Sequence, residues 1–177
     1  MATRRPSVLF LCTGNAARSV LAAAFLDRLT PTVSVASAGT HAVPGMPPGR
    51  DVRTVLREHG VGGFSHRSSS LEHTDLAEVD VVVALATEHV RYVRRHHSAH
   101  AVRTATLRRL CRDLLPGTDP LAVRVERLAL NTVALEEWED VDDPAGHDID
   151  VYRACGKDIA SLIEQLAPRL VGHATLF

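Results

Sequence analysis

The chain has 177 residues, of which 45% are hydrophobic and 23% charged, the balance of an ordinary globular protein. This length fits a single domain over residues 1–177. A net charge of -1 argues against a nucleic-acid partner, which would call for a basic excess, and no apolar run approaches the ~20 residues that cross a bilayer. Three cysteines make no disulfide framework, so we expect reduced thiols in a cytoplasm.

Short apolar runs alternate with segments of helical periodicity. Residues 8–11 form a continuous apolar run, which predicts a strand covered on both faces. Residues 18–29 repeat an apolar side chain at every fourth position, which predicts a helix. A second strand is predicted over 32–36, and a helix over 50–59 that ends at Gly60.

The same alternation continues to the C-terminus. We predict strands over 80–85 and 101–106, and helices over 88–97, 107–115, 122–137 and 152–170. Buried strands that alternate with helices indicate an α/β fold with a parallel sheet and helices on both of its faces.

The first cysteine stands where a strand pattern gives way to a helix pattern. Five residues separate Cys12 from Arg18: Thr13, Gly14, Asn15, Ala16 and Ala17. Backbone N–H groups in such a loop can bind a phosphate beside the helix N-terminus, with Gly14 permitting the tight backbone. Arg18 would bind two oxygens of the phosphate. The positive electrostatic potential of the loop and the helix N-terminus also favours the thiolate of Cys12, to which Ser19 could donate a hydrogen bond. The simpler alternative is that Cys12 is a small buried hydrophobe.

A nucleophile that attacks phosphorus also needs an acid to protonate the leaving group. Asp142 and Asp143 precede Pro144, which restricts Asp143 to an extended conformation and can hold its carboxylate at a fixed angle. The alternative is that Asp-Asp-Pro forms only a turn and a cap before the last helix.

The order of these motifs resembles that of one family. "LFLCTGNAARS", "SAGTH", "SHRSSSL" and "DDPAG" follow one another as in the low-molecular-weight protein tyrosine phosphatases, whose superfamily includes related arsenate reductases. The resemblance runs from about residue 8 to 170. It implies a three-layer domain with a four-stranded parallel sheet, in the order 2-1-3-4, flanked by helices, and it implies no cofactor and no metal.

The resemblance also assigns roles to matching residues. It implies that Cys12 is the nucleophile, that Arg18 stabilises the transferring group, and that Asp143 is the general acid. Supporting roles fall on Asn15, Ser19, Ser37 and His66. The chain departs from the family at Ala17, where a cysteine is frequent, and at Val20, where proline is usual.

No aromatic residue lies at 41–44 or directly after Pro144, so a phosphotyrosine ring would lack its usual stacking surfaces. We therefore expect a cysteine-dependent phosphomonoester hydrolase, most similar to a protein tyrosine phosphatase, that binds phosphate or a similar oxyanion. Its substrate is a phosphorylated protein or a small-molecule phosphate, with no nucleic acid or membrane as partner. An arsenate reductase that uses an external small thiol and a non-catalytic phosphate-binding module are the alternatives.

Three other features have simple structural interpretations. Cys111 and Cys155 fall on apolar helix stripes and are expected to pack in the core. The basic run 91–100 lacks acidic or cysteine ligands at metal spacing and is expected to be a solvated helix end. The acidic residues within 136–140 are expected to form a solvated edge.

Overall fold

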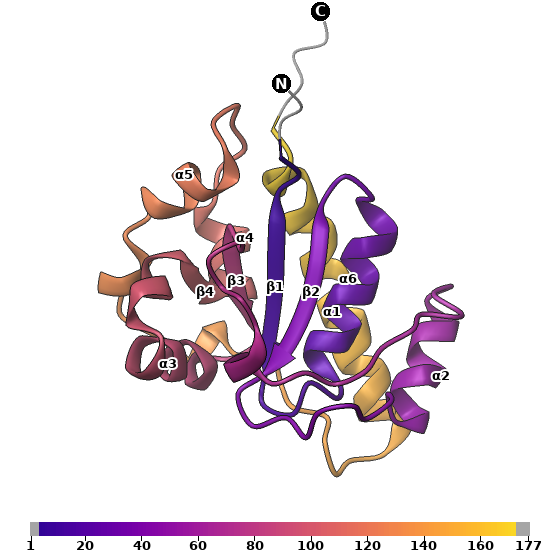
Figure 1. The fold of residues 1–177 in the computed structure, drawn as a ribbon. Helices are drawn as coiled ribbons and strands as arrows, with labels where there is room; N and C mark the ends of the chain where they lie inside the picture. The colour runs from indigo at the N-terminus through magenta and orange to yellow at the C-terminus, as the bar shows by residue number, and fades with distance from the viewer. Residues whose placement is uncertain (1–3, 173–177) are drawn as a thin grey trace, which may run out of the picture.

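The centre of the computed structural model, which describes residues 4–172, is a sheet of four parallel strands. The strands are β1 (Ser7–Cys12), β2 (Ser34–Gly39), β3 (Val81–Ala84) and β4 (Thr104–Thr106). Their order across the sheet is β2-β1-β3-β4 (Figure 1). The prediction of a parallel sheet in this order is therefore confirmed.

Helices cover the sheet on both sides. They are α1 (Arg18–Leu29), α2 (Arg50–Glu58), α3 (Thr87–His96), α4 (Leu107–Asp113), α5 (Leu121–Glu126) and α6 (Ile149–Leu170). Figure 1 shows α1 and α6 side by side against the sheet, with α2 beside the end at which the strand arrows point. Within residues 4–172, no helix is long and apolar enough to cross a bilayer.

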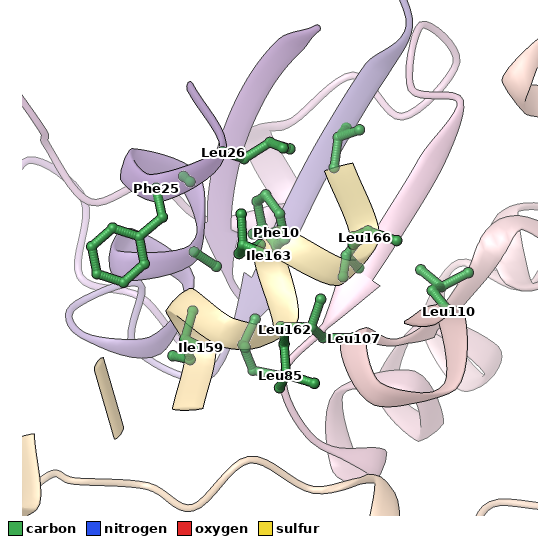
Figure 2. Close-up of a cluster of buried hydrophobic side chains, with 14 of the residues drawn as sticks. Phe10, Phe25, Leu26, Leu85, Leu107, Leu110, Ile159, Leu162, Ile163 and Leu166 are labelled. Atoms are coloured by element: carbon green, nitrogen blue, oxygen red, sulfur yellow. The ribbon is translucent and has the colours of Figure 1, made fainter. Parts of the chain in front are cut away.

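The central strand β1 is buried on both faces. Phe10 packs with Leu26 of α1 and Ile163 of α6 in one hydrophobic cluster (Figure 2), whereas Leu9 and Leu11 face a second cluster on the opposite side. Each fully buried side chain of this size contributes about 1.5–3 kcal/mol relative to an exposed one. The core therefore fixes the end of β1, and with it Cys12.

Two strands differ from their predicted bounds by more than one residue at an end. β2 begins later than predicted and continues to Gly39, because it stays paired with β1 as far as Cys12. A Cβ at Gly39 would lie 2.5 Å from the Thr13 carbonyl oxygen, so only glycine allows this close approach. The predicted strand over 101–106 keeps only its last three residues, since a 3-10 helix occupies Ser98–Arg103.

The predicted helix over 122–137 is wrong beyond its first turns. α5 ends at Glu126, and Ala129 adopts a left-handed conformation with φ of 49°. The Arg94 guanidinium then donates to the carbonyl oxygens of Leu130 and Val133, both at 2.7 Å. A tertiary contact from α3 thus satisfies carbonyl groups that a continuing helix would have used.

Candidate active site

Cys12 lies at the end of β1, with its sulfur 3.0 Å from the Ser19 hydroxyl oxygen. Ser19 Oγ accepts a hydrogen bond from Asn15 Nδ2 at 2.9 Å. Because that bond uses a lone pair of the oxygen, the hydroxyl hydrogen is free to point at the sulfur. The Ser19 hydroxyl is therefore placed to donate to the Cys12 sulfur, the role that the resemblance implied for Ser19.

Asn15 holds the shape of the loop that follows Cys12. Its φ is 50°, and every polar atom of its buried side chain is paired. Nδ2 donates to Ser19 and Ser37, and Oδ1 accepts from the Ser69 N–H at 2.8 Å. The Asn15 carbonyl oxygen lies 3.0 Å from His66 Nε2, which must be the donor. Ser19, Ser37 and His66, to which the resemblance gave supporting roles, thus all contact Asn15, and Ser69 is an addition.

The left-handed residue of the loop is Asn15 rather than Gly14. Gly14 has no positive φ, and a Cβ there would make only an ordinary 3.8 Å contact with Ala16. Asparagine tolerates this conformation better than other residues with a side chain. α1 begins at Arg18 without a side-chain cap on Ala17, so its first N–H groups remain available to an anion.

Arg18 joins the loop to the segment that carries the predicted acid. Its buried guanidinium donates through Nη1 to the Val141 carbonyl at 3.1 Å and through Nη2 to Asp143 Oδ2 at 3.0 Å. The Asp143 side chain is 50% exposed, and its Oδ1 accepts from the Ala145 N–H. The structure therefore brings Cys12, Arg18 and Asp143 to one end of the sheet, and Asp143 rather than Asp142 pairs with the arginine.

Thr13 is supported by a histidine that the motifs did not single out. His89 is only 1% exposed, and its Nδ1 accepts from the Ala86 N–H at 3.1 Å. Burial lowers the pKa of His89 to about 3, with help from the charge of Arg18. The neutral ring must then carry its hydrogen on Nε2, which donates to Thr13 Oγ1 at 2.9 Å.

The segment before Asp143 is anchored by polar contacts to α3 and to the residue that follows β3. The Val141 N–H donates to the carbonyl of Leu85, which follows β3, and the Asp140 carboxylate accepts from the N–H of Thr87 in α3. The prediction that residues 136–140 form a solvated edge is wrong for Glu139, which is 0% exposed.

Glu139 is tolerated in the interior because it is fully paired. It accepts hydrogen bonds from Arg109 and from the Thr106 hydroxyl. Burial alone would raise the pKa of Glu139. The hydrogen bonds and the charge of Arg109 together lower this pKa by more than burial raises it, so the net shift is downward. The carboxylate therefore stays ionised and ties the acid segment to α4.

The two other thiols are buried, as expected for packing residues. Burial raises the pKa of Cys111 to about 11 and that of Cys155 to about 12, which leaves both protonated and unreactive. Among residues 4–172, no group of three or more His, Cys, Asp or Glu side chains is placed to hold a metal ion.

The family described as "Low molecular weight phosphotyrosine protein phosphatase" has a model that matches residues 7–115. The chain belongs to this family. It is therefore a cysteine-dependent phosphatase, in agreement with the function predicted from its motifs.

Relatives of this chain are named for different substrates, phosphoarginine or phosphotyrosine. A protein-arginine-phosphatase from Geobacillus stearothermophilus is 32% identical over 92% of this chain and 95% of its own. The structure of the YwlE arginine phosphatase from Geobacillus stearothermophilus has a TM-score of 0.75 at 30% identity, covering 93% of this chain and 92% of its own. The low molecular weight protein-tyrosine-phosphatase Etp of Escherichia coli K12 is 32% identical, but over only 49% of this chain and 59% of its own.

Proposed function

We propose that this phosphatase hydrolyses phosphorylated protein side chains through a cysteinyl-phosphate on Cys12. The observation that carries the proposal is the 3.0 Å pair between Arg18, which emerges from the Cys12 loop, and Asp143. This pair puts the carboxyl group proposed as the acid next to the guanidinium that would bind the phosphate. Arg18 and the N–H groups of residues 13–18 would hold the non-bridging oxygens of the transferring phosphoryl group.

The reaction has two steps, formation of the cysteinyl-phosphate and its hydrolysis. The Cys12 thiolate attacks phosphorus, the bond from phosphorus to the leaving group breaks, and Asp143 gives its proton to the departing atom. Asp143 then takes a proton from water, which attacks the cysteinyl-phosphate. The sulfur–phosphorus bond breaks, inorganic phosphate leaves, and the thiolate is restored with Ser19 donating to it. Because the cycle needs a reduced Cys12, we place the protein in the cytoplasm.

We propose phosphoarginine as the modified side chain. Two relatives matched by sequence over 92% of this chain are both named protein-arginine-phosphatase, whereas Etp matches over about half of it. Carboxylates also border the loop: the half-exposed Asp143, and Glu88, which is 64% exposed and lies 3.4 Å from Thr13 Oγ1. Such a rim attracts a cationic guanidinium. Residues 41–44 and 144–147 contain no Phe, Tyr or Trp to stack on a phosphotyrosine ring.

The test compares kcat/KM for a phosphoarginine protein, a phosphotyrosine peptide and an aryl phosphate, with a fourth assay for thiol consumption driven by arsenate. We expect the phosphoarginine protein to exceed the phosphotyrosine peptide by roughly tenfold or more, the effect of one well-placed charged contact. A preference for phosphotyrosine would contradict the arginine assignment. Arsenate-dependent thiol consumption without phosphate release would contradict the hydrolase mechanism for this site.

A further inference from the structure

A basic cavity lies beside α2, separate from the Cys12 loop. Its volume is about 360 Å³. Three arginines and three apolar side chains line it: Arg50, Arg53, Arg57, Leu56, Val61 and Phe64. We call it the α2 pocket. Its charged rim and apolar floor suit a ligand that is anionic and partly hydrophobic.

The three arginines of the α2 pocket are uncompensated. Their spacing of three and four residues places Arg50, Arg53 and Arg57 on one face of α2. All three are exposed, and none forms an ion pair with any carboxylate in the part of the chain that the structure describes. On the same helix, Glu58 is already paired with Arg153 of α6 at 2.8 Å. The pocket therefore presents to solvent three guanidinium groups without a carboxylate partner, of which Arg57 also donates to the Thr54 hydroxyl.

The α2 pocket is connected to the Cys12 loop. The ring of Phe64 stacks on His66 with centroids 6.4 Å apart and planes 10° from parallel. His66 in turn donates to the Asn15 carbonyl in the loop. Figure 1 shows α2 near the end of the sheet at which β1 ends, so the pocket and the Cys12 loop lie toward the same end of the molecule.

We propose that the α2 pocket docks an acidic segment of the phosphorylated protein substrate. Carboxylates of that segment pair with the arginine forks, and an apolar side chain between them enters against Leu56 and Phe64. The proposal rests on the proposed function in taking a protein as substrate. Charge complementarity selects the occupant, because three arginines without carboxylate partners attract an acidic segment, repel a basic one and form no ion pair with a neutral one.

The first test measures binding without catalysis. The probe is an unphosphorylated fluorescent peptide, Glu-Glu-Leu-Glu-Glu, titrated against the full chain and followed by anisotropy. We expect R53E/R57E to weaken binding by roughly tenfold or more, and added salt to weaken it in the unmodified protein. R5E/R95E is the control, since it makes the same change of net charge at two exposed arginines outside the pocket. Equal binding to both double variants, or no binding to the unmodified chain, would overturn the proposal.

Further measurements separate this proposal from the proposed function. Aryl phosphate turnover reports folding and the chemistry of Cys12, and we expect it to be unchanged in R53E/R57E. With two phosphopeptides that differ only in an acidic or an amide flank, we expect R53E/R57E to raise KM for the acidic one alone. An unchanged KM would contradict docking even if the phosphatase chemistry is correct. A short single-stranded oligonucleotide that binds more tightly than the peptide, and loses binding in R53E/R57E, would also overturn the proposal.

Discussion

The Cys12 loop and the acid segment are built in different ways, although both contribute to one site. The loop is centred on a fully buried residue, Asn15, and every polar atom of the Asn15 side chain has a hydrogen-bond partner. The acid segment is held by contacts to distant elements, through Glu139, Asp140 and Val141. Asp143 itself remains half exposed at the end of these anchors.

This difference separates the two tasks of a phosphatase. An anion-binding loop works best when its donors are fixed before the substrate arrives, because no reorganisation is then needed during the reaction. A general acid must reach leaving groups of varied shape and exchange protons with water, which favours an exposed carboxylate on an anchored segment. Arg18 is the contact between the two regions, since it belongs to the loop and donates to the segment.

The largest expected effect comes from removing the nucleophile. We expect Cys12→Ser to lower aryl phosphate turnover by roughly 10⁴-fold or more, as in other enzymes that lose a covalent nucleophile. The phosphate-binding groups remain, so inorganic phosphate should still bind in a calorimetric titration. Cys111→Ser is the control, because burial keeps that thiol protonated. Turnover of Cys12→Ser near that of the control would contradict the role of Cys12.

Changing the acid should have a smaller and substrate-dependent effect. We expect Asp143→Asn to slow turnover by about 10²–10⁴-fold for a poor leaving group. The loss should be less for a good leaving group, which departs with little protonation. Steady-state rates across a series of aryl phosphates measure this dependence. If Asp142→Asn shows the same dependence instead, the acid is Asp142.

Breaking the anchor of the acid segment should lower stability. Glu139→Gln removes a buried charge that faces Arg109, and we expect the free energy of unfolding to fall by about 3 kcal/mol. Denaturant titration measures the change. The exposed neighbour Glu137 provides the control, since Glu137→Gln should shift the value by less than about 0.5 kcal/mol. Equal effects would mean that the buried pair does not hold the segment.

The smallest expected effect is a change in pH dependence. The pKa of His89 is lowered to about 3 in the folded protein, against about 6.5 when unfolded, so the unfolded chain binds more protons between these values. His89 therefore makes stability fall with decreasing pH in this window, by at most about 1.4 kcal/mol per pH unit. We expect the slope to be smaller in His89→Gln when unfolding is measured from pH 7 to 4.5. An unchanged slope would show that His89 does not titrate as a buried neutral ring.

The distance in sequence between interacting residues explains what the sequence could predict. Cys12, Asn15, Arg18 and Ser19 lie within eight positions, so their spacing and the strand-to-helix transition locate the loop. The family resemblance added Ser37, His66 and Asp143, which no local pattern connects to Cys12. The sheet order came from that resemblance too, while the alternation of elements predicted only a parallel sheet.

Features that depend on distant partners were predicted poorly. In the sequence, Glu139 resembles a surface carboxylate, because Arg109, with which it pairs in the interior, lies thirty positions earlier. The segment after Glu126 has a helical sequence pattern but is not helical, because Arg94 donates hydrogen bonds to two of its carbonyl oxygens. His89 has no motif, and its role follows only from the Ala86 N–H that fixes its tautomer. In each case a tertiary contact outweighs a local preference.

The most direct test of the central claim is to trap the covalent intermediate. Asp143→Asn should form the cysteinyl-phosphate readily from an aryl phosphate with a good leaving group, but hydrolyse it slowly because no base activates water. After acid quenching and digestion, mass spectrometry should find an addition of about 80 Da on the peptide that contains Cys12, as a phosphorylated nucleophile requires. The adduct on another residue, or continued phosphate release with no adduct at any quench time, would contradict the account.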